Sequence, residues 1–168
     1  MFSSDFNKAI AQESNTKVAQ LETSLGTIKI KLFTKEAPLT SQNFIDLINK
    51  GFYDGIIFHR VIDGFMIQGG DPTGTGMGGS GTVIPDEFKT GLSHGKPGIL
   101  SMANAGPGTT SSQFFITLTP QARLDGGYSI FGEVIEGMEV VTAIGKVKTG
   151  TNDRPVEDVK IIKATILE

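Results

Sequence analysis

Residues 56–70 read Ile-Ile-Phe-His-Arg-Val-Ile-Asp-Gly-Phe-Met-Ile-Gln-Gly-Gly, which places Arg60 inside an apolar run. The first seven residues are typical of a strand, whose alternation would set Arg60 between Phe58 and Ile62 on one face. The Asp-Gly pair that follows favours a turn, so the chain should reverse and form a short hairpin. A strand arginine usually lies at the surface with its stem on apolar neighbours. This hairpin would also gather an aromatic ring, a thioether and an amide around the cation.

The composition favours a single β-rich domain. Its 168 residues suffice for one domain with a sizeable core, and 22 glycines indicate frequent turns. A formal net charge of −3 supplies no basic field for nucleic acid or an anionic membrane surface. The absence of cysteine excludes disulfides, thiolate nucleophiles and cysteine metal ligands. A small molecule or a peptide is therefore the expected partner.

The chain shows no membrane or export signal. No apolar run approaches the length of about 18 residues that crosses a bilayer, and the first residues lack the basic start and apolar segment of a signal peptide. We expect a cytoplasmic protein, with the mature form of an exported protein as the open alternative. Residues 1–17 should form an N-terminal extension, as a short helix or a tail, ahead of one domain over residues 18–168.

Hydrophobic periodicity predicts the main elements. Apolar and polar residues alternate over residues 18–32 around a turn at 24–26, which predicts a β-hairpin. Residues 39–50 carry apolar side chains at helical spacing between Pro38 and Gly51, which predicts a helix. Further strands are predicted over residues 99–105, 112–118, 128–135 and 159–167, and a second helix over residues 138–144. The pattern favours a mainly β fold: a closed antiparallel barrel with helices at its openings.

Several chemistries find no support in the sequence. His59 and His94 have no further ligand residue at metal-binding spacing, and Ser101 and Ser111 have no visible base. Residues 74–79 match Gly-x-Gly-x-x-Gly, but no helix-forming segment follows, so the match to a dinucleotide site is weak. What remains is a set that binds and polarises without covalent chemistry: Arg60, Gln68, Gln113 and Asn104, among Phe65, Met66, Phe115 and Leu124.

Four motifs follow one another along the chain: Phe-His-Arg at 58–60, Gly-Phe-Met-Ile-Gln-Gly-Gly at 64–70, Ser-Met-Ala-Asn-Ala-Gly-Pro at 101–107 and Ser-Gln-Phe-Phe-Ile at 112–116. Together they resemble the cyclophilins, the cyclosporin-type peptidyl-prolyl cis-trans isomerases. The resemblance implies a closed eight-stranded antiparallel β-barrel capped by two α-helices, with a substrate groove on its outer face. It also implies a monomeric enzyme that needs no cofactor and acts on proline-containing peptides and unfolded or folding proteins.

The resemblance assigns roles to individual residues. The catalytic set that it implies is Arg60, Phe65, Gln68 and Asn104. The substrate-binding set that it implies is Met66, Gly76, Ala103, Gln113, Phe115, Leu124 and Tyr128. Two positions depart from the pattern of many members, since Arg123 stands in place of a tryptophan and Tyr128 in place of a histidine. Isomerase activity should survive both changes, whereas loss of the indole should weaken the binding of cyclosporin.

The mechanism that the resemblance implies involves no proton transfer. Arg60 would donate a hydrogen bond to the prolyl nitrogen of the twisted transition state, where the lone pair is localised on that nitrogen. The alternative function is a proline-peptide binding module or chaperone accessory that holds Xaa-Pro segments without turnover. A turnover assay separates the two.

Overall fold

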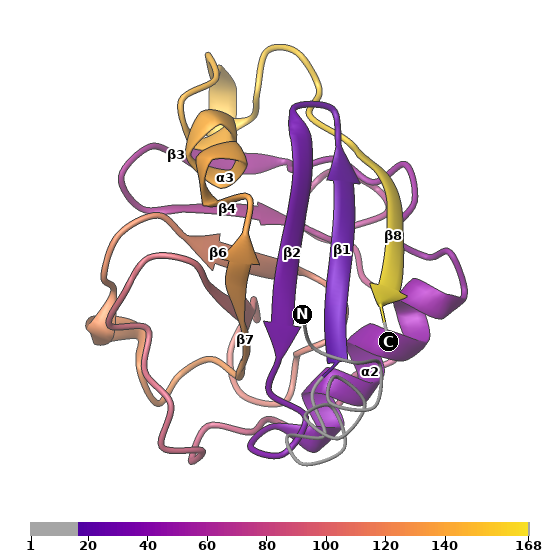
Figure 1. Ribbon diagram of the computed structural model, residues 1–168, viewed down its shortest axis with the longest axis vertical. Helices are drawn as coiled ribbons and strands as arrows, with labels where there is room; N and C mark the ends of the chain where they lie inside the picture. The colour runs from indigo at the N-terminus through magenta and orange to yellow at the C-terminus, as the bar shows by residue number, and fades with distance from the viewer. Residues whose placement is uncertain (1–16, 168) are drawn as a thin grey trace, which may run out of the picture.

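The computed structural model describes residues 17–167, in which eight antiparallel strands form one sheet. The strands are β1 (Lys17–Thr23), β2 (Gly26–Leu32), β3 (Arg60–Ile62), β4 (Met66–Gly69), β5 (Ile99–Met102), β6 (Phe114–Thr117), β7 (Ile130–Glu136) and β8 (Ile161–Leu167). Their order across the sheet is β3-β4-β6-β5-β7-β2-β1-β8. Figure 1 shows β1, β2 and β8 running across β4 and β6 at a steep angle. The curled sheet therefore encloses the core between its two halves.

A short bridge joins the two edge regions of the sheet. Ile57, which precedes β3, forms an antiparallel bridge with Lys160, which precedes β8. Beside it, the Phe58 amide donates to the Val159 carbonyl oxygen at 2.9 Å. The edges therefore meet through a few backbone hydrogen bonds rather than a full strand pair. The predicted mainly β fold, with eight antiparallel strands and two α-helices, is confirmed for the described part of the chain.

The α-helices α2 (Pro38–Asn49) and α3 (Met138–Gly145) lie at opposite ends of the barrel (Figure 1). Proline suits the first position of α2, because its missing N–H is not needed there. Glu87 satisfies a free donor of the first turn, since the Thr40 amide donates to its Oε1 at 2.6 Å. Gly51, with a φ of 74°, follows the end of the helix as predicted.

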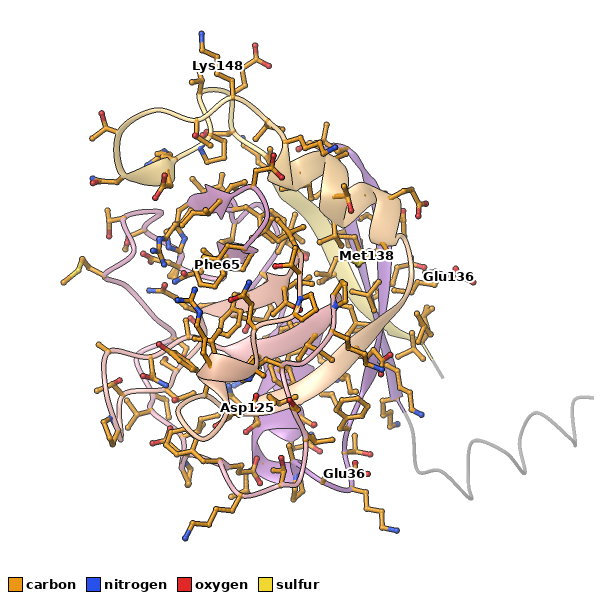
Figure 2. All side chains as sticks on the ribbon, turned by 90° about the vertical axis from the view of Figure 1, so that its left-hand side faces the viewer. Glu36, Phe65, Asp125, Glu136, Met138 and Lys148 are labelled. Atoms are coloured by element: carbon orange, nitrogen blue, oxygen red, sulfur yellow. The ribbon has the colours of Figure 1, made fainter. Side chains whose placement is uncertain are left out.

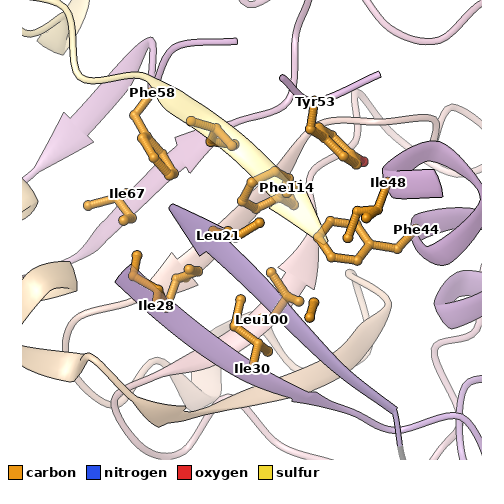
Figure 3. Close-up of a cluster of buried hydrophobic side chains, with 14 of the residues drawn as sticks. Leu21, Ile28, Ile30, Phe44, Ile48, Tyr53, Phe58, Ile67, Leu100 and Phe114 are labelled. Carbon is orange, nitrogen blue, oxygen red and sulfur yellow. The ribbon is translucent and has the colours of Figure 1, made fainter. Parts of the chain in front are cut away.

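Phe114 stands at the centre of the core (Figure 3). Its ring centroid lies 5.5 Å from that of Phe44 on α2 and 5.5 Å from that of Tyr53, both in edge-to-face geometry. Such pairs contribute roughly 0.5–1.5 kcal/mol beyond the burial of their area. The Tyr53 hydroxyl donates to the Ser112 carbonyl oxygen at 2.9 Å, which satisfies its polar end inside the core. The same burial raises the pKa of Tyr53.

The strand expected over residues 56–62 is reduced to the three residues of β3. Phe58 and Val61 both belong to the core, with exposed fractions of 0% and 1%, whereas Arg60 is exposed. The expectation that Arg60 shares a face with Phe58 is therefore wrong. The reason is a change of pairing partner: Phe58 bonds toward the β8 edge, while Arg60 already pairs with β4.

The N-terminal extension expected over residues 1–17 lies outside the described residues except for Lys17, where β1 begins. The hairpin predicted over residues 18–32 is confirmed as the pair β1–β2. Two single 3₁₀ turns, η1 (Ala122–Leu124) and η2 (Thr151–Asp153), lie in the connections after β6 and α3. Within residues 17–167, no helix has the length and hydrophobicity that spanning a membrane requires.

Candidate active site

The β3–β4 hairpin forms one side of the site. Arg60 pairs with Gln68 across it, and Gly64 turns the chain with a φ of 78°. Met66 is buried with an exposed fraction of 2%, while Phe65 is half-buried and lies on the face turned to the viewer in Figure 2. The predicted gathering of a cation, an aromatic ring, a thioether and an amide on one hairpin is confirmed.

A cavity of about 130 Å³, which we name the apolar pocket, opens beside the hairpin. It is lined by Arg60, Phe65, Met66, Gln68, Ala103, Asn104, Phe115, Leu124 and Tyr128. Phe115 is only 4% exposed, and the Tyr128 ring meets it edge-on with centroids 5.6 Å apart. The pocket suits a small apolar ring, and the Arg60 guanidinium in its lining can donate a hydrogen bond to an acceptor next to that ring.

A second cavity of about 290 Å³, the amide groove, is continuous with the apolar pocket because both share Gln68, Ala103 and Asn104. It is lined by Gln68, Gly76, Met77, Gly78, Ala103, Asn104, Ala105, Thr109, Ser111 and Gln113. Every site residue expected from the sequence lines one of these two cavities. The separate roles of those residues stay predictions. Met77, Gly78, Ala105, Thr109 and Ser111 are additional lining residues that the sequence reasoning missed.

A hydrogen-bond chain runs from the amide groove to the arginine. Gln113 donates through Nε2 to the carbonyl oxygens of Gly76 at 2.9 Å and Gly78 at 2.8 Å. Gln68 Nε2 donates to Gln113 Oε1 at 2.9 Å, and Arg60 Nη1 donates to Gln68 Oε1 in a long bond of 3.5 Å. Arg60 is thus oriented by one amide, and most of its donors stay available.

Asp71 organises the glycine-rich loop that carries Gly76 and Gly78. Its carboxylate accepts bonds from the backbone amides of Thr73 at 2.8 Å, Gly76 at 2.7 Å and Gly78 at 3.1 Å. Burial by itself would raise the pKa of Asp71, but the hydrogen bonds from Thr73, Gly78 and Gly76 lower it well below the ordinary value. The loop begins at Gly70, whose φ of 92° and close approach to the Ser112 oxygen leave no room for a side chain. The sequence showed the loop but not its carboxylate anchor.

Asn104 lines both the apolar pocket and the amide groove. Its Nδ2 donates to the Gly127 carbonyl oxygen at 2.9 Å, and its Oδ1 accepts from the Gly106 amide at 3.0 Å. The side chain therefore ties the turn after β5 to the segment that precedes Tyr128. Fixed in this way, Asn104 shapes the junction of the two cavities.

His94 supports the apolar pocket from behind. Its Nδ1 lies 2.8 Å from Asp125 Oδ1 and its Nε2 2.9 Å from Ser101 Oγ. The imidazole stacks on Phe115 with centroids 5.7 Å apart and an interplanar angle of 13°. Burial lowers the pKa of His94, against the opposing effect of Asp125. The structure thus supplies the base beside Ser101 that the sequence did not show, but both residues are fully buried, so this serine faces no substrate.

Arg123 lies over Phe65, which lines the apolar pocket. Its guanidinium carbon lies 5.1 Å from the centroid of the Phe65 ring, within the range of a cation–π contact. Its Nε donates to Gln121 Oε1 at 3.1 Å. Arg123 lies on η1, directly before Leu124, and Asp125 of the same turn is labelled on this face in Figure 2. A charged, flexible side chain therefore occupies the place that many family members give to an indole.

Other site chemistries find no support in residues 17–167. That part of the chain contains no group of His, Asp or Glu that could hold a metal ion. The Gly-x-Gly-x-x-Gly segment, residues 74–79, wraps around the Asp71 carboxylate, and no helix follows it. An anion already occupies the amides that a phosphate would need.

The apolar pocket, which Arg60 lines, and the amide groove beside it together form an elongated site on a β-barrel. Residues 18–166 match the family model described as cyclophilin type peptidyl-prolyl cis-trans isomerase/CLD. The chain belongs to this family of cyclophilin-type peptidyl-prolyl cis-trans isomerases, enzymes that interconvert the two forms of Xaa-Pro bonds.

Curated relatives and solved structures agree with this family. A peptidyl-prolyl cis-trans isomerase-like 1 of Gibberella zeae is 55% identical over 88% of this chain and 93% of its own length. A peptidyl-prolyl cis-trans isomerase of Schizosaccharomyces pombe is 56% identical over 88% of this chain and 97% of its own. A cyclophilin-type isomerase of Cryptosporidium parvum is 38% identical, with a TM-score of 0.88 over 91% of this chain and 98% of that one. The Cryptosporidium enzyme has also been solved in the presence of the dipeptide Ala-Pro.

Proposed function

We propose that the protein accelerates Xaa-Pro isomerisation without covalent chemistry, with Arg60 stabilising the twisted imide. The observation that carries this proposal is the position of Arg60, which is exposed and lines the apolar pocket. Gln68 orients the guanidinium through one long bond, so other N–H groups of Arg60 remain free to donate. A proline seated in the pocket places its nitrogen within reach of those donors.

The physical argument rests on what changes at the transition state. Rotation about the peptide bond has a barrier of roughly 18–20 kcal/mol because the nitrogen shares its lone pair with the carbonyl. In the twisted transition state this lone pair is localised on nitrogen and accepts a hydrogen bond, which it barely does when the bond is planar. A bond from Arg60 to that nitrogen is therefore stronger in the transition state than in either planar form. This difference is what lowers the barrier.

The surrounding residues supply position and a dry environment. Met66 and Phe115, both almost fully buried, form the floor on which the pyrrolidine ring packs. Ala103, Asn104 and Gln113 line the amide groove, which takes the peptide backbone next to the proline. Exclusion of water strengthens the bond from Arg60, and a fixed backbone keeps the imide in line with it.

The substrates follow from this geometry. The apolar pocket and the adjoining amide groove fit proline-containing segments of peptides and of unfolded or folding proteins, whose Xaa-Pro bonds are accessible. The Ala-Pro dipeptide used with the Cryptosporidium relative supports this class. One chain lines both cavities, so a single copy suffices for the site. Cyclosporin should bind the same pocket with reduced affinity, because Arg123 provides neither the apolar surface nor the donor of an indole.

The test is two-dimensional exchange NMR on a short Ala-Pro peptide in large excess over the protein. Uncatalysed exchange takes tens of seconds or more, so exchange cross-peaks within a second require turnover. We expect such peaks together with small, saturable shifts of the peptide signals. Saturable shifts without exchange peaks would overturn the proposal and leave a proline-binding module without turnover.

A further inference from the structure

A third cavity of about 610 Å³, the Arg154 groove, lies beside Arg60. It is lined by His59, Arg60, Gln68, Gly74, Thr75, Gly76, Thr151, Asn152, Asp153 and Arg154. Arg60 lines this groove as well as the apolar pocket, Gly76 lines it as well as the amide groove, and Gln68 lines all three cavities. The proposed mechanism uses the first two cavities and leaves the third without an occupant.

Arg154 is held in place but only weakly neutralised. Its Nη1 donates to the Gly74 carbonyl oxygen at 3.1 Å, which anchors η2 to the glycine-rich loop. Its Nη2 lies 3.6 Å from Asp158 Oδ1, and both side chains are about half exposed, at 48% and 46%. Exposed ion pairs of this kind are weak and screened by water. The guanidinium therefore keeps most of its capacity to bind another anion.

His59 forms part of the wall of the groove. The residue lines the groove and is only 7% exposed, and its Nδ1 has no hydrogen-bond partner within residues 17–167. That nitrogen is sealed from solvent, whereas Nε2 is the ring nitrogen on the side of Gly76, another residue of the groove lining. Burial lowers the pKa of His59, Asp71 raises it, and Arg154 and Arg60 lower it further. Burial thus disfavours the charged imidazole, and the fixed charges of the lining are those of Arg60, Arg154 and Asp153.

The place of the groove identifies its occupant as part of a bound peptide. With the proline in the apolar pocket, the amide groove takes the chain on the flank that passes Ala103 and Asn104. The Arg154 groove borders the apolar pocket at Arg60 and Gln68 and the amide groove at Gln68 and Gly76, so a side chain close to the proline can reach it. Two arginines against one carboxylate in the lining favour an acidic side chain there.

We propose that the Arg154 groove is a subsite for an acidic side chain of a peptide whose proline sits in the apolar pocket. The inference rests on the proposed function, because it takes the apolar pocket as the seat of the proline. It adds a preference among client sequences: Xaa-Pro segments with a carboxylate at one defined distance from the proline bind and turn over best.

The test compares Glu with Gln, which has the same size and no charge, at each position of an alanine peptide around one proline. For every pair, both the dissociation constant and kcat/KM are measured. We expect Glu to be preferred about two- to fivefold at a single position and to match Gln at the other positions. Arg154→Ala removes the cation and should bring the Glu/Gln ratio of kcat/KM at that position to about one. Asp153→Asn removes the carboxylate and should increase the same ratio.

Lys148→Ala is the matched control, because it also removes one positive charge from the same end of the molecule (Figure 2) and Lys148 does not line the groove. The Glu preference should persist in this variant. A Glu/Gln ratio near one at every position, or a preference that Arg154→Ala leaves unchanged, would overturn the proposal. A preference lost equally in Lys148→Ala would assign it to the overall field and would also overturn it. If the proposed function itself fails, the result is different: the Gln peptides would then bind without being isomerised.

Discussion

Gln68 donates through Nε2 to Gln113 Oε1 at 2.9 Å, and this contact turns the remaining oxygen of Gln68 toward Arg60. A side-chain amide has one donor end and one acceptor end, so fixing the first fixes the second. The orientation of the arginine is thereby linked to the glycine-rich loop, to which Gln113 is bonded at Gly76 and Gly78.

Gln113→Leu should therefore lower kcat by roughly tenfold, because Gln68 is then free to rotate and Arg60 loses its orientation. The measurement is the exchange rate of an Ala-Pro peptide at saturation, with thermal unfolding as a check on the fold. Gln42→Leu, an exposed change on α2, is the matched control and should keep the full rate. A kcat of Gln113→Leu equal to that of the parent protein would show that the chain of amides does not position Arg60.

Asp71→Asn should lower the free energy of unfolding by about 2 kcal/mol at neutral pH, because the charged acceptor of several backbone amides is lost. The folded-state pKa of Asp71 lies below the unfolded one. Its stabilising effect is thus complete above about pH 4, the ordinary carboxyl value, and is lost as the pH falls toward the folded pKa.

Denaturant unfolding of Asp71→Asn and the parent protein should accordingly give curves that differ at pH 7 and converge in acid. Asp63→Asn, at the exposed turn of the β3–β4 hairpin, serves as the comparison and should change the free energy of unfolding little at any pH. If the difference in the free energy of unfolding between Asp71→Asn and the parent stayed constant down to low pH, the charged Asp71 carboxylate would not be the source of the stabilisation.

His94 should make the protein less stable in mild acid. Burial lowers its folded-state pKa, so below about pH 6.5 the unfolded chain binds a proton that the folded chain does not. The free energy of unfolding should fall with decreasing pH in this range, by at most about 1.4 kcal/mol per pH unit for this group. His59 acts in the same direction. His94→Gln should flatten the pH dependence in part, and an unchanged slope would exclude His94 as its source.

Arg123→Trp should tighten the binding of cyclosporin by roughly tenfold, because a rigid indole adds an apolar surface and a donor at the edge of the pocket. Arg123→Ala separates this gain from simple removal of the charge and should bind close to the parent protein. The dissociation constants can be compared by titration calorimetry. Equal affinities for all three proteins would show that position 123 does not govern this ligand.

Locally encoded elements were predictable from the sequence. The helix expected over residues 39–50 is α2, shifted by one residue, because its apolar spacing, its Pro38 start and its Gly51 stop are all local signals. The alternation expected over residues 56–62 failed for Phe58, since this segment changes partner from the β8 edge to β4. Only the folded sheet, whose β8 edge comes to lie beside this segment, determines where that change falls.

In the site, too, local contacts could be predicted from the sequence and long-range contacts could not. Arg60 and Gln68 face each other across one short hairpin, so spacing alone brought them together. The partners of His94 lie 7 residues away at Ser101 and 31 residues away at Asp125, and no local pattern marks that arrangement. The Arg154 groove likewise joins the β3–β4 hairpin, the glycine-rich loop and η2, three segments that meet only in the folded barrel.

The most direct measurement of the central claim is peptide exchange by NMR with Arg60→Ala and Arg60→Lys against the parent protein, at matched occupancy of an Ala-Pro peptide. If Arg60 stabilises the twisted imide, kcat should fall by about 10²–10³ in Arg60→Ala. Arg60→Lys should retain only part of the parent kcat. In both variants the peptide dissociation constant should change far less than kcat. Exchange at nearly the parent rate in saturated Arg60→Ala would contradict the account and place the source of catalysis elsewhere in the pocket.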